Sequence, residues 1–313
     1  MPSRARRLSG PKSSGRRVLV LVLVALFLVV DVVVIALAVA RIADAEATAG
    51  GPIPSFGIPD VPTPEPEESA PPAALAAQNR YIATVDGVTM WRSTLGSCEG
   101  DDAVIEFSTN GGAAWSTLVT TEMRARQVLA LEVVDADTIW VVARAGDTCA
   151  VSGFASFTGG EFWEPRPEAV TLLRYLDRDA ADVVHLQGQP VAAPCAEPRQ
   201  SVSRDGATTV VCDDMVAEWS GSTGTWATLV VPGLLSAAPT AGNHTLAVWG
   251  AAGCDGVSIQ VVPSPLGLEQ PVRTGCIQAE TAPTDVSLLR SGNTVWAWVD
   301  GDFRVSADGG ASW

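Results

Sequence analysis

The sequence predicts an all-β domain built from a repeated unit of about four short strands, which follows one apolar span and a proline-rich linker. Three observations lead to this prediction. Turn sequences that end in tryptophan recur through the C-terminal part of the chain. The segments between them are short, rich in valine, threonine and tryptophan, and bounded by glycine, aspartate and asparagine, as strands are. No stretch has a persuasive helical periodicity, and residues 172–176 are a weak candidate only.

The chain begins with a basic tail, residues 1–17, and an apolar span, residues 18–40. The tail contains six basic residues and no acid, and the span has 23 residues that are apolar apart from Asp31. About 20 apolar residues cross a bilayer, and the basic flank places the N-terminus in the cytoplasm. We expect a transmembrane signal-anchor helix at 18–40, a single pass through the cell membrane, with everything after Arg41 extracytoplasmic.

A cleaved signal peptide is the competing interpretation of the span. Residues 36–38 and 38–40 both have the small-residue pattern of a cleavage site. The apolar run is longer than the usual h-region of about 7–15 residues, which favours the anchor. Asp31 costs about 2.5–3.5 kcal/mol on insertion scales. Either the surrounding valines and leucines outweigh that cost, or Asp31 makes a polar contact with a partner helix.

Residues 41–78 form a linker in which prolines and acids concentrate. They include Pro52, Pro54, Pro59, Pro62, Pro64, Pro66, Pro71 and Pro72, with Glu65, Glu67 and Glu68. Such a chain favours an extended, polyproline-like conformation. We expect a disordered spacer that ends where the β domain, residues 79–313, begins.

Two octapeptides, residues 108–115 (STNGGAAW) and 306–313 (SADGGASW), fit one pattern, S-x-[D/N]-x-G-x-x-W. Ser and Asp or Asn side chains stabilise a turn by bonding nearby backbone, and Gly supplies the positive φ of a tight hairpin. The Trp then buries a large ring at the start of the next strand. Residues 156–163 and 220–226 are degenerate copies without the acid. The defining residues are Ser108, Asn110, Gly112, Trp115, Ser156, Gly160, Trp163, Ser220, Gly224, Trp226, Ser306, Asp308, Gly310 and Trp313.

The spacing of the four tryptophans indicates the repeat length. The gaps are 48, 63 and 87 residues, and the last looks like two repeats whose missing turn is the worn segment 262–267. Four intervals then average about 49 residues, close to the blade of a β-propeller. We expect about five four-stranded blades at 79–120, 126–167, 190–230, 232–272 and 280–313. Residues 168–189 form either an insertion loop, which we prefer, or a worn sixth blade.

The turn pattern resembles the Asp-box, or BNR repeat, of sialidase-like β-propellers. The resemblance covers about 235 of the 313 residues, is specific at two turns and is loose elsewhere. This superfamily includes sialidases, sortilin-type receptors and a photosystem assembly factor, so the fold does not fix the function. The resemblance implies that the boxes lie at the outer rim, away from the site, and serve structure.

Two further expectations concern the packing of the ring. Tryptophans in second strands, at 140, 249, 296 and 298, are expected to pack between blades. Closure of the ring has three open solutions: a strand donated by residues just before Arg80, packing alone, or a continuation beyond Trp313.

Charge and cysteines restrict the class of partner and the compartment. Past Arg41 there are 34 acids against 13 arginines and no lysine, a balance of −21 that makes nucleic-acid binding unfavourable. An even number of cysteines in an exported domain indicates disulfides. From the repeats we expect Cys98–Cys149 between neighbouring repeats, Cys195–Cys212 within repeat three, and Cys254–Cys276 between repeat four and the segment after it. The single lysine and the alanine- and valine-rich composition are typical of a bacterial protein.

Two function classes remain. The first is a non-catalytic binding or scaffold module with a protein or glycan ligand at the propeller mouth. The second is a sialidase-like glycoside hydrolase, which the resemblance implies would need an arginine cluster, a Tyr–Glu nucleophile pair and an Asp acid/base. The F/Y-R-I-P segment of sialidases is missing, and the nearest imitation is Arg174-Tyr175 with Asp177 and Arg178. We expect no catalytic residues, although an arginine cluster facing a Tyr–Glu pair at the mouth would favour the enzyme.

Metal and cofactor signals are weak. Carboxylates that could hold Ca²⁺ occur at Asp177, Asp179 and Asp182, and at Asp101 with Asp102, without the spacing of a calcium loop. His185 and His244 stand apart from other ligands, and no phosphate loop or Ser-His-Asp arrangement is present. We therefore expect neither a metal nor a cofactor. Residues 243–245 fit a glycosylation sequon, a weak signal.

Overall fold

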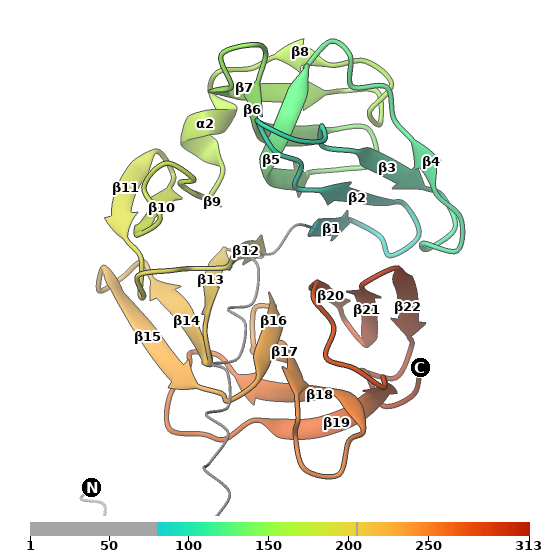
Figure 1. The fold of residues 1–313 in the computed structure, drawn as a ribbon, viewed down its shortest axis with the longest axis vertical. Helices are drawn as coiled ribbons and strands as arrows, with labels where there is room; N and C mark the ends of the chain where they lie inside the picture. The colour runs from blue at the N-terminus through green and yellow to red at the C-terminus, as the bar shows by residue number, and fades with distance from the viewer. Residues whose placement is uncertain (1–79, 205) are drawn as a thin grey trace, which may run out of the picture. The chain divides into compact units, whose positions relative to one another are not determined.

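The computed structural model describes residues 80–204 and 206–313, so the basic tail, the apolar span with Asp31 and the linker lie outside the described residues. The described chain forms six small antiparallel sheets around a common centre, a six-bladed β-propeller (Figure 1). Within these ranges no helix is both long and apolar enough to cross a bilayer. The all-β propeller is confirmed, with six blades instead of about five.

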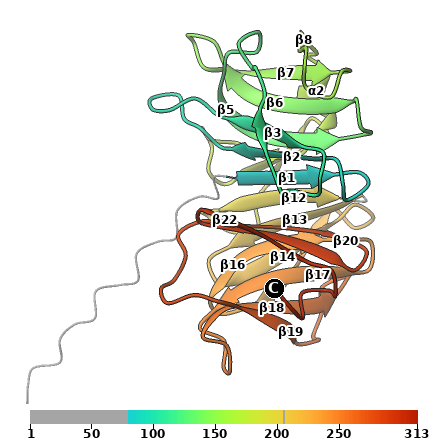
Figure 2. The ribbon, with the colours of Figure 1, turned by 90° about the vertical axis from the view of Figure 1, so that its right-hand side faces the viewer.

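The blades follow one another along the chain, and their strands run along the ring axis (Figure 2). Blade 1 contains β1 (Arg80–Thr84), β2 (Met90–Thr94), β3 (Ile105–Ser108) and β4 (Ser116–Thr117), and blade 2 contains β5 (Ala125–Val133), β6 (Ile139–Ala145), β7 (Ala150–Ser156) and β8 (Glu164–Pro165). Blade 3 contains β9 (Tyr175–Leu176), β10 (Val183–Leu186) and β11 (Gln189–Ala192), and blade 4 contains β12 (Gln200–Arg204), β13 (Ala207–Cys212), β14 (Met215–Ser220) and β15 (Thr225–Val230). Blade 5 contains β16 (Leu234–Pro239), β17 (Asn243–Trp249), β18 (Gly256–Pro263) and β19 (Val272–Gln278), and blade 6 contains β20 (Val286–Ser291), β21 (Thr294–Val299) and β22 (Asp302–Ser306).

Blade 3 shows that the preferred interpretation of residues 168–189 as an insertion loop is wrong and that the worn sixth blade is correct. Its strands have only two to four residues, and it has no tryptophan turn. The interval from Trp163 to Trp226 therefore holds two blades, so the mean repeat is about 40 residues rather than about 49. The weak helix candidate is also displaced, because α2 is Ala169–Leu172 and the chain is already in β9 at Tyr175.

The alternation of strand direction gives the ring two distinct ends. The tryptophan-turn end carries the turns after the first and third strands of the four-stranded blades. The cystine end carries the turns after the second strands and the connections between blades. Blade 3 is inverted relative to this scheme: Asp179 after β9 pairs with Arg144 near the end of β6, at 2.9 Å. β9 thus runs like a second strand, and the loop after it lies at the cystine end.

Three of the four tryptophan turns share one set of hydrogen bonds. In each, the Ser hydroxyl oxygen accepts the N–H of the Gly four residues later, at 2.8–3.0 Å. The side chain two residues after that Ser accepts a further backbone N–H, and the residues in this position are Asn110, Thr158 and Asp308. Thr158 replaces the missing acid of 156–163. Residues 220–226 form a different turn, in which the Gly224 N–H bonds the Ser220 carbonyl.

The glycines of these turns permit contact with the preceding blade. Gly112 has a φ of 90°, and a Cβ there would lie 2.3 Å from Phe303 of blade 6. A Cβ on Gly160 would lie 2.4 Å from Leu118, which comes directly after β4 of blade 1. Each turn therefore closes its own hairpin and also packs between neighbouring blades.

The core lies between the blades, as expected for large rings on second strands. Trp296 and Trp298 are buried, whereas Trp140 and Trp249 are half-buried and pack against inter-blade clusters. Trp91 on β2 is fully buried and was not singled out from the sequence. Its indole N–H donates to the Gly159 carbonyl of blade 2 at 3.1 Å.

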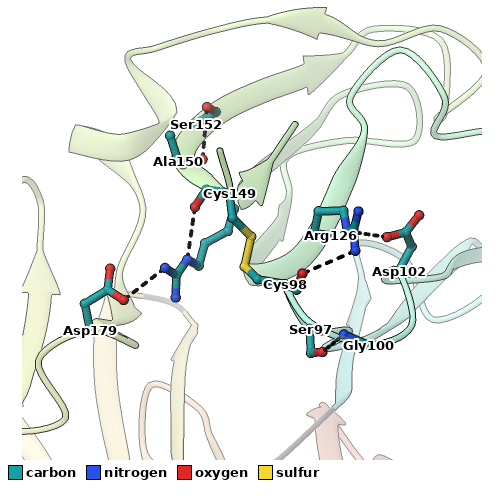
Figure 3. Close-up of a disulfide and its surroundings, with 10 residues drawn as sticks. Ser97, Cys98, Gly100, Asp102, Arg126, Cys149, Ala150, Ser152 and Asp179 are labelled. Atoms are coloured by element: carbon teal, nitrogen blue, oxygen red, sulfur yellow. Dashed lines mark hydrogen bonds and ion pairs between the residues drawn. A yellow bond between two sulfur atoms is a disulfide. The ribbon is translucent and has the colours of Figure 1, made fainter. Parts of the chain in front are cut away.

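The three expected disulfides are present. Cys98–Cys149 joins the loops after β2 and β6 of neighbouring blades (Figure 3). Cys195–Cys212 ties the connection before β12 to the end of β13, so Cys195 is not in a strand of blade 4 as expected. Cys254–Cys276 lies within blade 5, because that blade extends to Gln278, beyond the expected boundary at 272. All three lie at the cystine end, and no described cysteine is free.

Side-chain contacts join the first and last blades. Arg80 of β1 pairs with Asp285 at 3.1 Å, and its carbonyl accepts the Ser287 hydroxyl of β20 at 3.0 Å. The Trp296 indole N–H donates to the Gly111 carbonyl at 3.3 Å. Packing thus connects blades 1 and 6 within the described residues, while the segment before Arg80 lies outside them.

Candidate functional site

The centre of the ring contains a cavity of about 380 Å³. Its walls come from the inner strands β1, β5, β12, β16 and β20 and from residues flanking β9. Apolar side chains such as Ile82, Leu131 and Leu288 supply much of the lining. A volume of this size falls at the lower end of small-molecule sites, which combine apolar walls with a few polar groups.

The charge of the cavity opposes that of the whole chain. Five arginines and one acid line it: Arg80, Arg174, Arg178, Arg199, Arg204 and Glu132. The chain as a whole carries a formal charge of −15. The cavity is therefore a local cationic site in an acidic protein, a distribution that concentrates anionic ligands.

Arg80 and Arg199 are held by neighbouring groups of the protein. Arg80 pairs with Asp285, donates to the Asp300 carbonyl and stacks on the Trp298 ring. Arg199 is 8% exposed and donates to the carbonyls of Cys212 and Leu234, at 3.0 and 2.5 Å.

Burial lowers the pKa of the Arg199 guanidinium, and the nearby carboxylates of Asp213 and Asp214 partly offset this effect. Because an arginine guanidinium stays protonated in proteins, Arg199 contributes fixed positive charge.

Arg178 occupies a different environment at the cystine end. Its guanidinium lies beside the Tyr81 hydroxyl, and its Nε is buried without a hydrogen-bond partner among the described residues. The Tyr81 hydroxyl itself donates to the Leu129 carbonyl at 2.8 Å. Burial raises the pKa of Tyr81, and Arg178 opposes that rise. Tyr81 is thus a neutral phenol held in place, and Arg178 retains donor capacity toward the cavity.

In the segment around β9, the arginines and the acids have different surroundings. Arg174 and Arg178 line the cavity. Asp177 accepts from His185 Nε2 at 3.0 Å, and Asp179 pairs with Arg144 of blade 2. The acids are therefore engaged with protein partners, while the arginines remain on the cavity side.

β12 adds polar groups next to Arg199. Gln200 is 6% exposed, and its side-chain oxygen accepts the Ser236 hydroxyl at 3.1 Å and the Ala237 N–H at 3.3 Å. The Ser201 hydroxyl oxygen is buried and has no hydrogen-bond partner among the described residues. Both residues line the cavity near its cystine end.

The residues predicted as a sialidase-like imitation do not form that site. Tyr175 is 3% exposed and stacks on His185, with ring centroids 4.6 Å apart and an interplanar angle of 14°. Burial raises the pKa of the Tyr175 phenol, which disfavours the phenolate that a nucleophile would need. Glu132 lies near the end of β5, at the tryptophan-turn end, whereas Tyr81 is at the start of β1. The arginine cluster is present, but it does not face a Tyr–Glu pair.

Three of the five possible calcium ligands are engaged elsewhere. Asp102 pairs with Arg126 at 2.7 Å, and Asp177 and Asp179 have the partners given above. In residues 80–204 and 206–313, no group of three or more His, Cys, Asp or Glu side chains is placed to hold a metal ion.

His244 and the sequon lie in the core between blades 4 and 5. His244 and Thr245 are fully buried, and Asn243 is half-buried with its side-chain oxygen enclosed. The His244 ring bonds Glu218 at 3.1 Å and Thr209 at 3.3 Å. A glycosyltransferase would need this segment exposed, so the structure does not favour the sequon.

Sequence reasoning singled out Arg174 and Arg178 but missed Arg80, Arg199, Arg204, Gln200 and Ser201. One signal was available: Arg199, Arg204 and Arg80 lie at or beside first strands, which line a propeller's centre. Without the sixth blade in place, the first strands of the ring could not be assembled around one axis.

No protein-family model matches the chain, and no curated protein matches it. Among solved structures it is similar to a GH74 enzyme of Niastella koreensis, at 13% identity and a TM-score of 0.41, covering 72% of this chain and 44% of that one. It is similar to a Trypanosoma rangeli sialidase mutant displaying trans-sialidase activity, at 12% identity and a TM-score of 0.41, covering 74% and 53%. It is also similar to YCF48 bound to D1 peptide, at 13% identity and a TM-score of 0.28, covering 77% and 86%. The chain spans less than half the length of the GH74 enzyme.

Proposed function

We propose that the protein is a membrane-anchored binding module whose propeller is displayed outside the cell and holds its ligand at the central cavity. The single observation that carries this proposal is the cavity itself, which is cationic and apolar. Its arginines supply binding groups, and its two possible catalytic partners, Tyr81 and Glu132, lie toward opposite ends. Three disulfides support an oxidising compartment, and the apolar span at 18–40 supports the anchor.

The topology is tested with the full chain carrying one epitope tag at each end. We expect protease added to intact cells to remove the C-terminal tag and to leave the N-terminal tag. Thiol labelling after denaturation without reductant should find no free cysteine, because all six are paired. A protected C-terminal tag, or six reactive thiols, would contradict the proposed location.

The second candidate function is a sialidase-like glycoside hydrolase, which only the arginine-lined cavity favours. The full chain is incubated with a fluorogenic sialoside, and we expect no turnover above the uncatalysed rate. Tyr81 donates to a carbonyl and Tyr175 is buried, so neither is activated as a nucleophile. Turnover that is abolished in Tyr81→Phe or Tyr175→Phe would establish the hydrolase instead.

A further inference from the structure

We propose that the central cavity binds a small organic acid, with Arg178 at its cystine end as the anchor for the carboxylate. This inference rests on the proposed binding function and specifies its ligand. The site combines Arg178 with Ser201 and Gln200, and places apolar side chains further along the walls.

Unused donors gather at one end of the cavity. Among the described residues, the buried side-chain atoms without a hydrogen-bond partner include Arg178 Nε, Arg199 Nε and Ser201 Oγ, and all three residues line the cavity. Arg199 Nε has Asp213 only at 3.8 Å, beyond hydrogen-bond range. Buried donors are normally satisfied by protein, water or ligand. Their presence in the lining of one cavity, toward its cystine end, indicates a ligand rich in acceptors.

The side chains here are fixed before any ligand arrives. Gln200 is held through its oxygen by Ser236 and Ala237, which leaves its NH₂ group as the remaining donor. Arg178 is positioned beside the Tyr81 hydroxyl, which in turn is bound to the Leu129 carbonyl. Preorganised donors lose little side-chain entropy on binding, which favours affinity.

The chemistry of the lining selects a carboxylate over other ligands. Guanidinium, hydroxyl and amide N–H groups all donate, and the planar guanidinium matches the two oxygens of a carboxylate. The apolar walls formed by Ile82, Leu131 and Leu288 suit a carbon skeleton, which inorganic phosphate lacks. A volume of about 380 Å³ admits a small organic molecule and is too small for a folded partner.

The test titrates the full chain in detergent with paired probes and records intrinsic tryptophan fluorescence and thermal stability. Glucuronate is compared with methyl glucoside, succinate with succinamide, and inorganic phosphate serves as the anion without a skeleton. We expect at least one carboxylate to bind saturably at concentrations up to about 10 mM, ten times a Kd of about 1 mM. Its neutral counterpart should have no effect, and phosphate should bind more weakly.

Variants then locate the carboxylate. Arg178→Gln should weaken binding roughly tenfold to a hundredfold, because it removes a charge-assisted hydrogen bond. Arg174→Gln is the matched control: it also removes one half-buried cavity arginine, but on the other side of β9, and should change affinity much less. Ser201→Ala should weaken binding without altering charge, and Arg124→Gln, whose side chain is 59% exposed, should have no effect.

Several outcomes would overturn the inference: no carboxylate binds, the neutral probes bind equally well, or Arg174→Gln and Arg124→Gln weaken binding as much as Arg178→Gln. If Arg178→Gln fails to fold, Ser201→Ala decides, and unchanged affinity in that variant contradicts the site. These results are separable from the proposed function. If the propeller binds none of the probes but its C-terminal tag is still removed by external protease, the proposed location stands and only the organic-acid ligand is contradicted.

Discussion

Glu218 on β14 holds a turn that belongs to the next blade. Its carboxylate accepts the Ser264 hydroxyl at 2.7 Å and the Leu266 N–H at 3.0 Å, and it bonds the His244 ring. This is the worn segment 262–267, where a tryptophan turn was expected from the spacing. In place of an Asp or Asn within the turn, a carboxylate from blade 4 supplies the acceptor, and so joins blades 4 and 5.

We expect Glu218→Gln to destabilise the protein by about 3 kcal/mol, because it breaks a largely buried charged network. Burial alone would raise the pKa of Glu218, but hydrogen bonds from Ser264, His244 and Leu266 hold it below its ordinary value. A carboxyl with a lowered pKa stabilises the fold above the unfolded-state pKa of about 4.3, and loses that contribution as pH falls toward the folded-state value. The difference in unfolding free energy between wild type and Glu218→Gln should therefore shrink below about pH 4.

A double-mutant cycle with His244→Gln isolates the Glu218–His244 bond from the hydrogen bonds of the turn. Denaturant unfolding of the two single variants and the double variant should give a coupling of about 1–3 kcal/mol. Additive effects, or a Glu218→Gln deficit that is constant with pH, would show that the carboxylate charge does not hold this joint.

At the scale of elements, the disulfides differ in the length of chain they close. Cys98–Cys149 spans 51 residues and two blades, whereas Cys195–Cys212 and Cys254–Cys276 span 17 and 22 residues. Because a cross-link mainly restricts the unfolded chain, removing the first should cost about 4 kcal/mol and the others about 3 kcal/mol.

Paired Cys→Ser variants of each disulfide, compared by denaturant unfolding under oxidising conditions, check this order. Arg126 donates to the Cys98 carbonyl at 3.2 Å (Figure 3). Arg144 donates to the Cys149 carbonyl at 3.1 Å. Both hydrogen bonds should hold the loops in place without the cross-link. A larger loss for the 17-residue disulfide would contradict a mechanism based on loop length.

The elements with a strong local signal could be predicted from the sequence. The turns with a Gly at positive φ were placed correctly, because their stability is local. Of the four tryptophans only Trp226 lies within the following strand, whereas Trp115 and Trp163 directly precede β4 and β8. Blade 3 could not be placed, because strands of two to four residues such as β9 carry almost no periodic signal and are fixed by neighbouring blades.

The central cavity could not be predicted from the sequence, because its lining includes residues that flank β9 of blade 3. Arg178 was predicted as a charge in an irregular segment, but its approach to Tyr81 depends on β1 and the residues after β9 lining the same central cavity. The disulfide pairs were predictable, since the repeats place cysteines at equivalent ends of their hairpins.

For the whole ring, the joint between blades 1 and 6 is made by a stack of alternating cations and rings. The Trp298 ring lies between the guanidinium groups of Arg80 and Arg92, at 4.3 and 4.4 Å from its centroid. Arg92 also lies 4.3 Å from the centroid of Trp115, and pairs with Glu106 at 2.7 Å. Blade 1 contributes the arginines and Trp115, and blade 6 contributes Trp298, so the stack links the two ends of the propeller.

We expect Arg92→Met to destabilise the ring by about 2 kcal/mol, because it keeps an apolar stem but removes a largely buried cation from between two rings. Arg92→Lys should recover only part of this, since an ammonium cannot stack as a planar guanidinium does. In hydrogen exchange, the amides of β20–β22 and β1–β2 should lose protection while those of blade 4 keep theirs, because opening begins at the joint. Arg304→Met is the control, because Arg304 lies on β22 of blade 6 and its exposed side chain pairs with Asp302 of the same strand. Uniform loss of protection around the ring would mean that the stack adds to global stability without acting as the closure.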